Sequence, residues 1–206
     1  MNNKIKIINN DCEQIIKKFN HQKFNNKKIL LLGGNGFLAN YIIYTFNLLI
    51  SKNKVNCRLD IVSKSNPKKL LKNILNNNKS FKFFKSDISK LNELEKFKDK
   101  YDFIFFCVNY GQPKMFMANQ KSTILINTLS LNYFLENCMS IKSKFLYFSS
   151  VDVYGDTSNY NGRIKEDYHG NLVLGSERGA YGESKRVGEI LCKIYNKNTK
   201  KKNVKI

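Results

Sequence analysis

Short apolar runs alternate along the chain with longer stretches of mixed character. The runs at 29–32, 57–63, 80–87, 101–108, 144–150 and 203–206 predict strands. A helix is expected after the first strand, and others near 66–76, over about 119–138 and around Tyr181. The unbroken apolar run at 29–32 is typical of a strand that is buried on both faces. This alternation predicts an α/β fold, a Rossmann-type doubly wound parallel sheet with helices on both faces.

The first 27 residues have a different pattern. They are polar apart from seven spaced apolar residues, and Asp11 with Gln14 matches a capping box. We therefore expect residues 1–27 to form an N-terminal arm with a short helix, and residues 28–206 to form an NAD(P)-binding Rossmann domain.

Composition narrows the class of protein. The chain of 206 residues suffices for one sizeable α/β domain. No run of about 18 apolar residues predicts a membrane span, and the N-terminus has no apolar segment typical of a secretory signal. Five scattered cysteines without a CxxC pair indicate reduced thiols in a cytoplasmic protein. With only two histidines and no Cys/His cluster, we expect no metal site.

The formal charge of +20 raises the question of nucleic-acid binding. Only four of the 36 basic residues are arginine, and the lysines are spread over the chain instead of forming one stripe with aromatic residues between them. We therefore expect no specific binding of nucleic acid. A small polyanionic ligand also suits this charge.

The segment "GGNGFLA" follows the first predicted strand and opens a helix. Gly33, Gly36 and Ala39 give the spacing GxxGxxA. Glycines at such a turn let the backbone approach a pyrophosphate, which then lies at the positive N-terminus of the helix. The alternative is an ordinary turn between a strand and a helix.

The end of the second strand should lie near the adenosine ribose of a dinucleotide. An acidic residue there would favour NAD, but Asp60 lies inside the strand and the tip reads Ser63-Lys64-Ser65. Lys64 would instead suit a 2′-phosphate, so the choice between NAD and NADP stays open. Asp87 and Ile88 after the third strand either meet the adenine edge or begin a helix.

In "GAYGESKRVGE", Tyr181 and Lys185 stand four residues apart and share one face of a helix. An ammonium at this spacing lowers the pKa of a phenol and lets it exchange a proton with a sugar hydroxyl. The spacing by itself is also common on solvated helices.

Six segments in order carry a resemblance to extended short-chain dehydrogenases/reductases of the nucleotide-sugar epimerase/dehydratase family: "GGNGFLA", "SDI", "DFIFFCVN", "NTLSLNYFLENC", "KFLYFSSVDVYGD" and "YGESKRVGE". The resemblance implies that Tyr181 is the acid/base, that Lys185 binds the nicotinamide ribose, and that Ser150 holds the reacting hydroxyl. Together with the turn, it assigns cofactor contacts to Gly33, Asn35, Gly36, Phe37, Leu38, Ser63, Asp87, Ile88, Val108, Tyr181 and Lys185.

Asp152 bears on the subfamily. The chain is similar to 4,6-dehydratases and UDP-glucuronate decarboxylases, which carry a carboxylate two residues before the tyrosine of this motif, normally Glu. Asp152 is one methylene shorter, and Val151 replaces the Asp that dehydratases place before it. The alternative is that Asp152 braces the loop. Arg178 either lies near the phosphates of the substrate or cofactor, or braces the same loop. In the first case Arg178 and Ser150 would both contact the substrate.

The implied activity is NAD-dependent modification of a nucleotide sugar through transient oxidation at C4, ending in loss of water or of carbon dioxide. This activity belongs to the lyase class. One alternative is a 4-epimerase, which belongs to the isomerase class, and the other is a non-catalytic dinucleotide-binding module. The module is considered because the smaller C-terminal substrate lobe of such enzymes is not present in the 206 residues. We also expect a homodimer when the protein is full-length.

Overall fold

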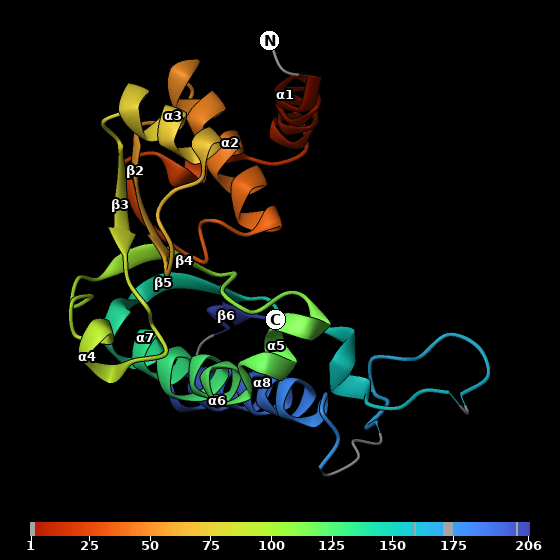
Figure 1. The fold of residues 1–206 in the computed structure, drawn as a ribbon. Coiled ribbons are helices and arrows are strands. Elements are labelled where there is room, and N and C mark those ends of the chain that lie inside the picture. The colour runs from red at the N-terminus through yellow and green to blue at the C-terminus, as the bar shows by residue number, and fades with distance from the viewer. Residues whose placement is uncertain (1–2, 159, 171–174, 201) are drawn as a thin grey trace. The chain divides into compact units, whose positions relative to one another are not determined.

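The computed structural model describes residues 3–158, 160–170, 175–200 and 202–206 (Figure 1). The strands are β1 (Lys27–Leu32), β2 (Cys57–Ser63), β3 (Phe81–Lys85), β4 (Tyr101–Phe106), β5 (Met139–Tyr147) and β6 (Val204–Lys205). The helices are α1 (Asn3–Lys17), α2 (Phe37–Ser51), α3 (Lys69–Asn77), α4 (Leu91–Leu94), α5 (Pro113–Ala118), α6 (Gln120–Leu125), α7 (Leu131–Cys138) and α8 (Gly179–Asn198). Short turns η1 (His21–Phe24), η2 (Ile126–Ser130) and η3 (Val151–Tyr154) join some of them.

The strands form a sheet in the order β3-β2-β1-β4-β5-β6. The pairs β1–β2, β1–β4, β2–β3 and β5–β6 are all parallel. This order, with helices flanking the sheet, is that of a Rossmann-type fold. The predicted fold class is therefore confirmed.

The chain divides into two compact units. The first comprises residues 1–87, 100–108 and 139–144, and the second comprises residues 88–99, 109–138 and 145–206. Strand β5 contributes its beginning to the first unit and its end to the second. The expected boundary after residue 27 separated an N-terminal arm from a Rossmann domain, whereas these two units are each made of several separate segments of the chain.

The core of the first unit lies between the strands and helices α1, α2 and α3. Ile29 and Leu31 of β1 belong to this cluster with Ile43 of α2 and Leu71 of α3. Leu30 lies on the opposite face of β1 and is fully buried as well. Burial on both faces explains why this strand is apolar at every position from Ile29 onward.

Helix α1 belongs to the first unit. It spans 15 residues and packs against α2, with Ile8, Cys12 and Ile16 in the core cluster. The expected capping role of Asp11 is wrong, because Asp11 lies inside the helix, where its carboxylate accepts a hydrogen bond from the Tyr41 hydroxyl at 3.1 Å. Residues 1 and 2 of the expected arm lie outside the described residues.

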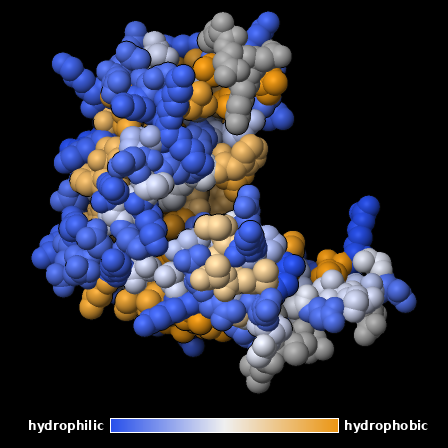
Figure 2. Space-filling model, in the orientation of Figure 1, coloured by the Kyte–Doolittle hydropathy of each residue, from blue (hydrophilic) through white to orange (hydrophobic). Residues whose placement is uncertain are grey.

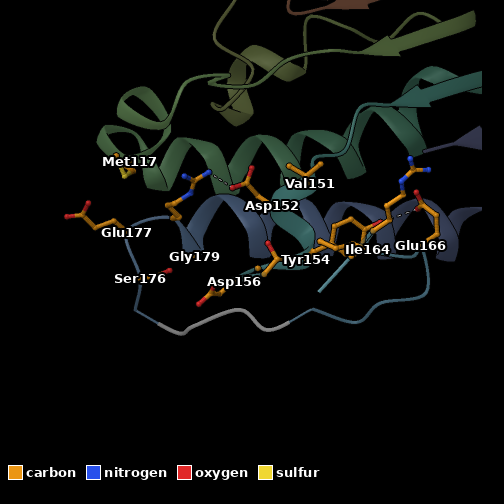
Figure 3. A pocket seen from close by; sticks show the side chains of 15 residues that line it. Met117, Val151, Asp152, Tyr154, Asp156, Ile164, Glu166, Ser176, Glu177 and Gly179 are labelled. Carbon is orange, nitrogen blue, oxygen red and sulfur yellow. Dashed lines mark hydrogen bonds and ion pairs between the residues drawn. The ribbon is translucent and has the colours of Figure 1, made fainter. Parts of the chain in front are cut away.

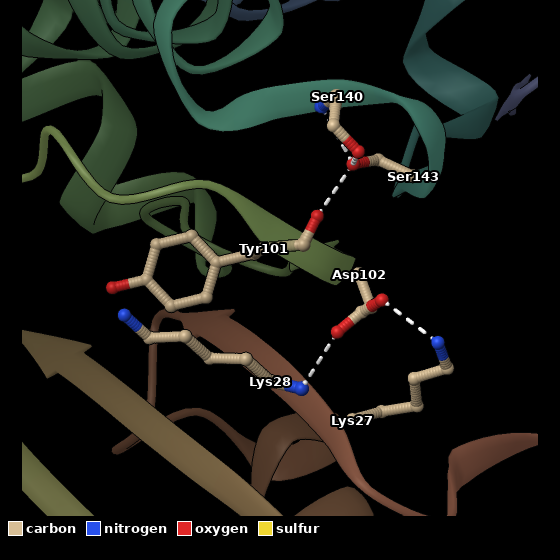
Figure 4. Close-up of polar contacts among 6 residues, drawn as sticks. All are labelled: Lys27, Lys28, Tyr101, Asp102, Ser140 and Ser143. Atoms are coloured by element: carbon tan, nitrogen blue, oxygen red, sulfur yellow. Dashed lines mark hydrogen bonds and ion pairs between the residues drawn. The ribbon is translucent and has the colours of Figure 1, made fainter.

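Polar contacts join the first residues of β1 and β4 to each other and to β5 in the first unit (Figure 4). The Asp102 carboxylate accepts hydrogen bonds from the Lys28 backbone N–H at 2.9 Å and from Lys27 Nζ at 3.0 Å. The Ser143 hydroxyl of β5 donates to the Tyr101 carbonyl of β4. These contacts fix the N-terminal ends of β1 and β4 against each other and join the start of β4 to the middle of β5, away from the carboxyl ends of β1 and β4, where Rossmann folds bind ligands.

The second unit is built on the long helix α8. The predicted helix over about 119–138 is present, but it is interrupted by the π-helical turn η2. Asn127 of η2 is fully buried; its amide donates to Ser184 Oγ at 3.1 Å and its carbonyl accepts from the Tyr147 hydroxyl at 3.1 Å. Insertion of this side chain between α8 and β5 explains the wider turn, since π turns occur where a functional or packing constraint overrides the regular helix.

Hydrophilic side chains cover most of the face shown in Figure 2, and apolar ones appear in separate patches. Within the described residues no helix is long and apolar enough to cross a membrane. The five cysteines are free thiols, and all but Cys107 are buried.

Candidate active site

The glycine-rich turn between β1 and α2 lies in the first unit, and two of its glycines are required by packing. Gly33 has φ +92°, and a Cβ there would stand 2.8 Å from both the Cys107 carbonyl oxygen and Val108 Cα. A Cβ at Gly34 would stand 2.2 Å from Ile61 Cγ2. The turn therefore lies directly against β2 and the end of β4.

Gly36 differs from these two. It is the N-cap of α2 with φ −72° and no side-chain cap, and a Cβ there would approach Gly33 O only to 3.1 Å. A side chain at position 36 would therefore disturb the fold less than a side chain at position 33. The first N–H groups of this 15-residue helix have no side-chain cap, and the glycines leave the backbone accessible. Such a helix N-terminus suits the pyrophosphate of a dinucleotide. Phe37 and Leu38 at this end are 76% and 52% exposed.

Asn35 ties the glycine-rich turn to the loop after β2. Its side-chain amide donates to Ser65 Oγ at 2.9 Å and to the Asn66 carbonyl at 3.0 Å. Its carbonyl oxygens accept from the Lys68 backbone N–H at 3.2 Å and from Lys68 Nζ at 3.0 Å. The expected cofactor residue Asn35 therefore positions the loop that follows Ser63.

The two carboxylates near the tip of β2 are both engaged by the protein. Asp60 is 1% exposed and accepts from Arg58 Nε at 3.1 Å and from the Tyr101 hydroxyl at 3.0 Å. Its two partners lie on β2 itself and on β4, which β1 separates from β2 in the sheet. Asp87 pairs with Lys64 at 3.0 Å.

A second group of candidate residues gathers in the second unit around η3. Ser150 caps this turn, and its hydroxyl donates to Asp152 Oδ2 at 2.9 Å. Asp152 Oδ1 accepts from the Arg178 guanidinium at 2.7 Å. Asp152 thus links the serine to the residue just before α8, and Figure 3 shows it among the residues that line a cavity.

Tyr181 lies on the first turn of α8 and is 8% exposed. The Phe116 ring stacks on it, with centroids 4.3 Å apart and an interplanar angle of 9°. Burial raises the pKa of the Tyr181 hydroxyl; a hydrogen bond with Ser150 and the charge of Arg178 lower it, whereas the charge of Asp152 raises it further. The net result is a pKa above the ordinary value, whereas the sequence led us to expect a lowering by Lys185.

Lys185 is 2% exposed, and its ammonium donates to the Phe148 carbonyl and lies 4.5 Å from the centre of the Tyr147 ring. Since Tyr147 bonds to Asn127, the lysine is held by a chain of buried contacts. Sequence reasoning did not single out Asn127 or Phe116. The segment "NTLSLNYFLENC" contained the first, but nothing in the periodicity distinguished it from other polar residues of a helix.

The cavity beside Asp152 has a volume of about 1120 Å³ and lies within the second unit (Figure 3). Asp152, Tyr154, Arg163, Glu166 and Arg178 are among its lining residues. Glu166 lies in the loop between η3 and α8 and accepts a hydrogen bond from the Tyr154 hydroxyl at 3.3 Å, which joins this loop to η3. The cavity is large enough for a ligand beyond ordinary drug size and carries both charges.

Among the described residues, no group of three His, Cys, Asp or Glu side chains is arranged to hold a metal ion.

Comparison with known proteins decides between the families that this geometry allows. Residues 29–205 match the model of the NAD dependent epimerase/dehydratase family. The chain belongs to this family. The resemblance read from the motifs is thereby confirmed, and the family's cofactor is NAD.

The bifunctional polymyxin resistance protein ArnA of Wigglesworthia glossinidia brevipalpis is 31% identical over 182 residues, which cover 84% of this chain and 25% of that protein. UDP-glucuronic acid decarboxylase 1 of Danio rerio is 27% identical over 173 residues, covering 83% and 38%. The chain therefore spans well under half the length of these relatives. The solved structure of DesIV, a dTDP-glucose 4,6-dehydratase of Streptomyces venezuelae, shares the fold with a TM-score of 0.66 at 15% identity, covering 86% and 53%.

The predicted site residues fall into two groups. Gly33, Asn35, Gly36, Phe37, Leu38, Ser63, Asp87 and Val108 lie in the first unit, and Ile88, Ser150, Asp152, Arg178, Tyr181 and Lys185 lie in the second. Within the second unit Ile88 stands apart from η3, because it is buried and its carbonyl accepts from Ser130 Oγ. The other residues of that group surround η3 and the start of α8.

Proposed function

We propose that the protein modifies a nucleotide sugar in an NAD-dependent reaction that begins with oxidation of the sugar at C4. The observation that carries this proposal is the linked set Ser150, Asp152, Arg178 and Tyr181 beside a large cavity. Family membership supports it, and the relative that is a UDP-glucuronic acid decarboxylase suggests the substrate class.

NAD, when bound, accepts a hydride and returns it, so it is regenerated. We infer that the turn Gly33–Ala39 holds its pyrophosphate and that Lys185 holds its nicotinamide ribose. Tyr181 takes the proton of the substrate hydroxyl, and Ser150, already bonded to Asp152, orients that hydroxyl. Because its pKa is raised, Tyr181 is mostly protonated at neutral pH until a positive charge lies near it.

Asp152 distinguishes the branches of the reaction. Loss of water needs a base that removes the C5 proton, and Asp152 is the carboxylate available beside Ser150. Loss of carbon dioxide needs none, because the C5–C6 bond breaks, its electron pair passes into the 4-keto group, and a proton is then added at C5. Both Asp152 oxygens already have partners in Ser150 and Arg178. We therefore propose decarboxylation of a UDP-uronate, with 4,6-dehydration second.

The test is to incubate the full-length protein with UDP-glucuronate, UDP-glucose and dTDP-glucose and to follow the products by mass. Loss of carbon dioxide from UDP-glucuronate, retained to within about tenfold in Asp152→Asn, is the expected result. Loss of water from a hexose, cut by about 10²–10⁴ in the same variant, assigns the dehydratase branch instead. Asp167→Asn, an exposed carboxylate elsewhere on the loop, is the matched control.

Two other outcomes would contradict this proposal and favour one of the alternative functions. A product of unchanged mass means an epimerase in which Asp152 only braces the loop. Binding of NAD without any product means a non-catalytic module.

We also propose that the partner of the protein is a second copy of itself. Val187, Ile190 and Ile194 form an apolar stripe along α8 and are 40%, 52% and 47% exposed. Apolar side chains are visible in Figure 2 at the lower edge, where α6 and α8 lie in Figure 1. An exposed stripe of this kind is typical of an interface. Sedimentation should show a dimer that Ile190→Lys converts to monomer, whereas Ile141→Lys, on β5, leaves it intact.

A further inference from the structure

The tip of β2 presents no carboxylate that is available to a ribose diol. Asp60 is the only acidic residue between positions 14 and 86, and its buried carboxylate is occupied by Arg58 and Tyr101. Asp87, the next in the sequence, is paired with Lys64. An NAD-specific Rossmann fold uses a carboxylate to accept from the ribose hydroxyls. Here both carboxylates of this region are neutralised by cations of the protein.

The same tip presents cations and a hydroxyl donor. Lys64 directly follows β2, and its side chain is 58% exposed. Lys68 Nζ lies 3.0 Å from the Asn35 carbonyl, which places an ammonium at the glycine-rich turn itself. Ser65 Oγ accepts from the Asn35 amide, so its hydroxyl hydrogen remains a donor. Asn35 fixes this loop through four further contacts, with Ser65, Asn66 and Lys68.

We propose that the loop Lys64–Lys68 is a subsite for a phosphate monoester, the 2′-phosphate of NADP, and that this chain departs from the NAD of its family by binding NADP(H) more tightly than NAD(H). The hydride chemistry proposed above is the same with either dinucleotide. This proposal rests on cofactor binding at the Gly33–Ala39 turn, as proposed above. A phosphate monoester carries a charge of about −1.5 to −2 at neutral pH and three strong acceptor oxygens. Two ammonium groups and one hydroxyl satisfy such a group, whereas a neutral ribose hydroxyl meets no free carboxylate on this loop.

The charge balance supports the same choice. From Ser63 to Lys72 there are four lysines and no acidic residue. Lys64 is already neutralised by Asp87, which is 19% exposed, so a bound phosphate has to compete with one carboxylate for it. The Lys68 ammonium donates to the neutral Asn35 carbonyl, which leaves its charge for the ligand. Lys68 is therefore expected to contribute at least as much as Lys64.

The experiment measures cofactor affinity directly and not activity. Because the chain contains no tryptophan, NADH and NADPH can be titrated by their own fluorescence without an indole background. NADPH should bind more tightly than NADH and should lose affinity more steeply with added KCl. Lys64→Ala with Lys68→Ala should weaken NADPH roughly tenfold and change NADH less than about twofold.

Two further variants separate this subsite from the general positive field. Lys72→Ala removes an exposed charge on α3 and should leave the NADPH:NADH affinity ratio unchanged. Asp87→Asn releases Lys64 and should raise that ratio, even if an adenine contact is lost, because such a loss affects both cofactors equally.

The possible outcomes distinguish this inference from the proposed function. Tighter binding of NADH, or an affinity ratio that the double variant leaves unchanged, overturns the phosphate subsite while cofactor binding stands. If neither dinucleotide binds at millimolar concentration, cofactor binding at the glycine-rich turn fails, and the subsite fails with it.

Discussion

Substitution of Gly188 by alanine tests how α8 is seated in the second unit. Gly188 is buried where α8 crosses β5, and a Cβ there would stand 2.2 Å from the Tyr147 hydroxyl oxygen and 2.6 Å from its Cζ. Tyr147 is 1% exposed and is bonded to Asn127, so its ring has little room to move aside. The methyl group must therefore displace either the ring or the helix.

The magnitude follows from two opposing effects. Overpacking of a well-packed core costs typically about 1–3 kcal/mol. Alanine is favoured over glycine inside a helix by about 1 kcal/mol. Since the contact at Gly188 is with a ring atom and not a flexible chain end, the upper half of the first range applies. The net loss of unfolding free energy should be about 1–2 kcal/mol, or a fall in Tm of roughly 2–8 °C for a chain of this size.

Thermal and urea unfolding followed by circular dichroism provide the measurement, and a double-mutant cycle identifies the contact. In a Tyr147→Leu background the ring is gone, so Gly188→Ala should become neutral or stabilising. Gly111→Ala is the control, because a Cβ at Gly111 meets nothing within 4 Å. If Gly188→Ala were as stable as the unmodified protein with Tyr147 present, the close packing of α8 on β5 would be refuted.

Three other predictions concern the first unit. Burial raises the pKa of Cys57 to about 11, so its folded thiol keeps a proton that the unfolded chain loses above about pH 9. This thiol should lower stability by about 1.4 kcal/mol per pH unit from pH 9 to 11. Urea titrations of Cys57→Ala should give a slope that is shallower by this amount, because the buried Cys192 contributes a fall of its own. Burial opposes ionisation of Asp102, but the Lys28 N–H and Lys27 lower its pKa. This half-exposed carboxylate should add less than about 1 kcal/mol above pH 4, lost as the pH falls further, and Asp102→Asn should remove that dependence in acid unfolding. Gly36→Val should abolish NADH binding in fluorescence titrations while leaving circular dichroism unchanged; a variant that binds equally well contradicts a pyrophosphate site there.

Strand positions were predictable where the pattern was strongest. The run 57–63 coincides with β2, because each of its residues from Leu59 to Val62 is buried on one face or the other. The fifth strand was placed at 144–150 but runs from Met139 to Tyr147. Its first five residues mix apolar with polar side chains, and one of the polar ones, Ser143, is buried. The Ser143 hydroxyl donates to the Tyr101 carbonyl, a contact that hydrophobicity cannot indicate.

The candidate site was predictable as a set of residues but not as a network of contacts. The motifs indicated Ser150, Tyr181 and Lys185, yet the sequence could not tell that burial dominates the pKa of Tyr181. Nor could it tell that Asp152 reaches Arg178, 26 residues away, because the intervening loop has no regular pattern. Side-chain partners across a loop depend on tertiary packing, and a single sequence carries no direct signal of them.

The rare arginines show how charge is used in this chain. Thirty-two of the 36 basic residues are lysines, which produce a broad positive field. Of the four arginines, Arg58 holds the buried Asp60, Arg178 holds Asp152, and Arg163 lines the cavity. A planar guanidinium keeps its charge when partly buried and fixes the direction of its hydrogen bonds, whereas an ammonium acts as a point charge. The lysines therefore account for attraction of an anionic ligand in general, whereas Arg58 and Arg178 each hold one carboxylate in a fixed direction, and only the second of these carboxylates lines the cavity.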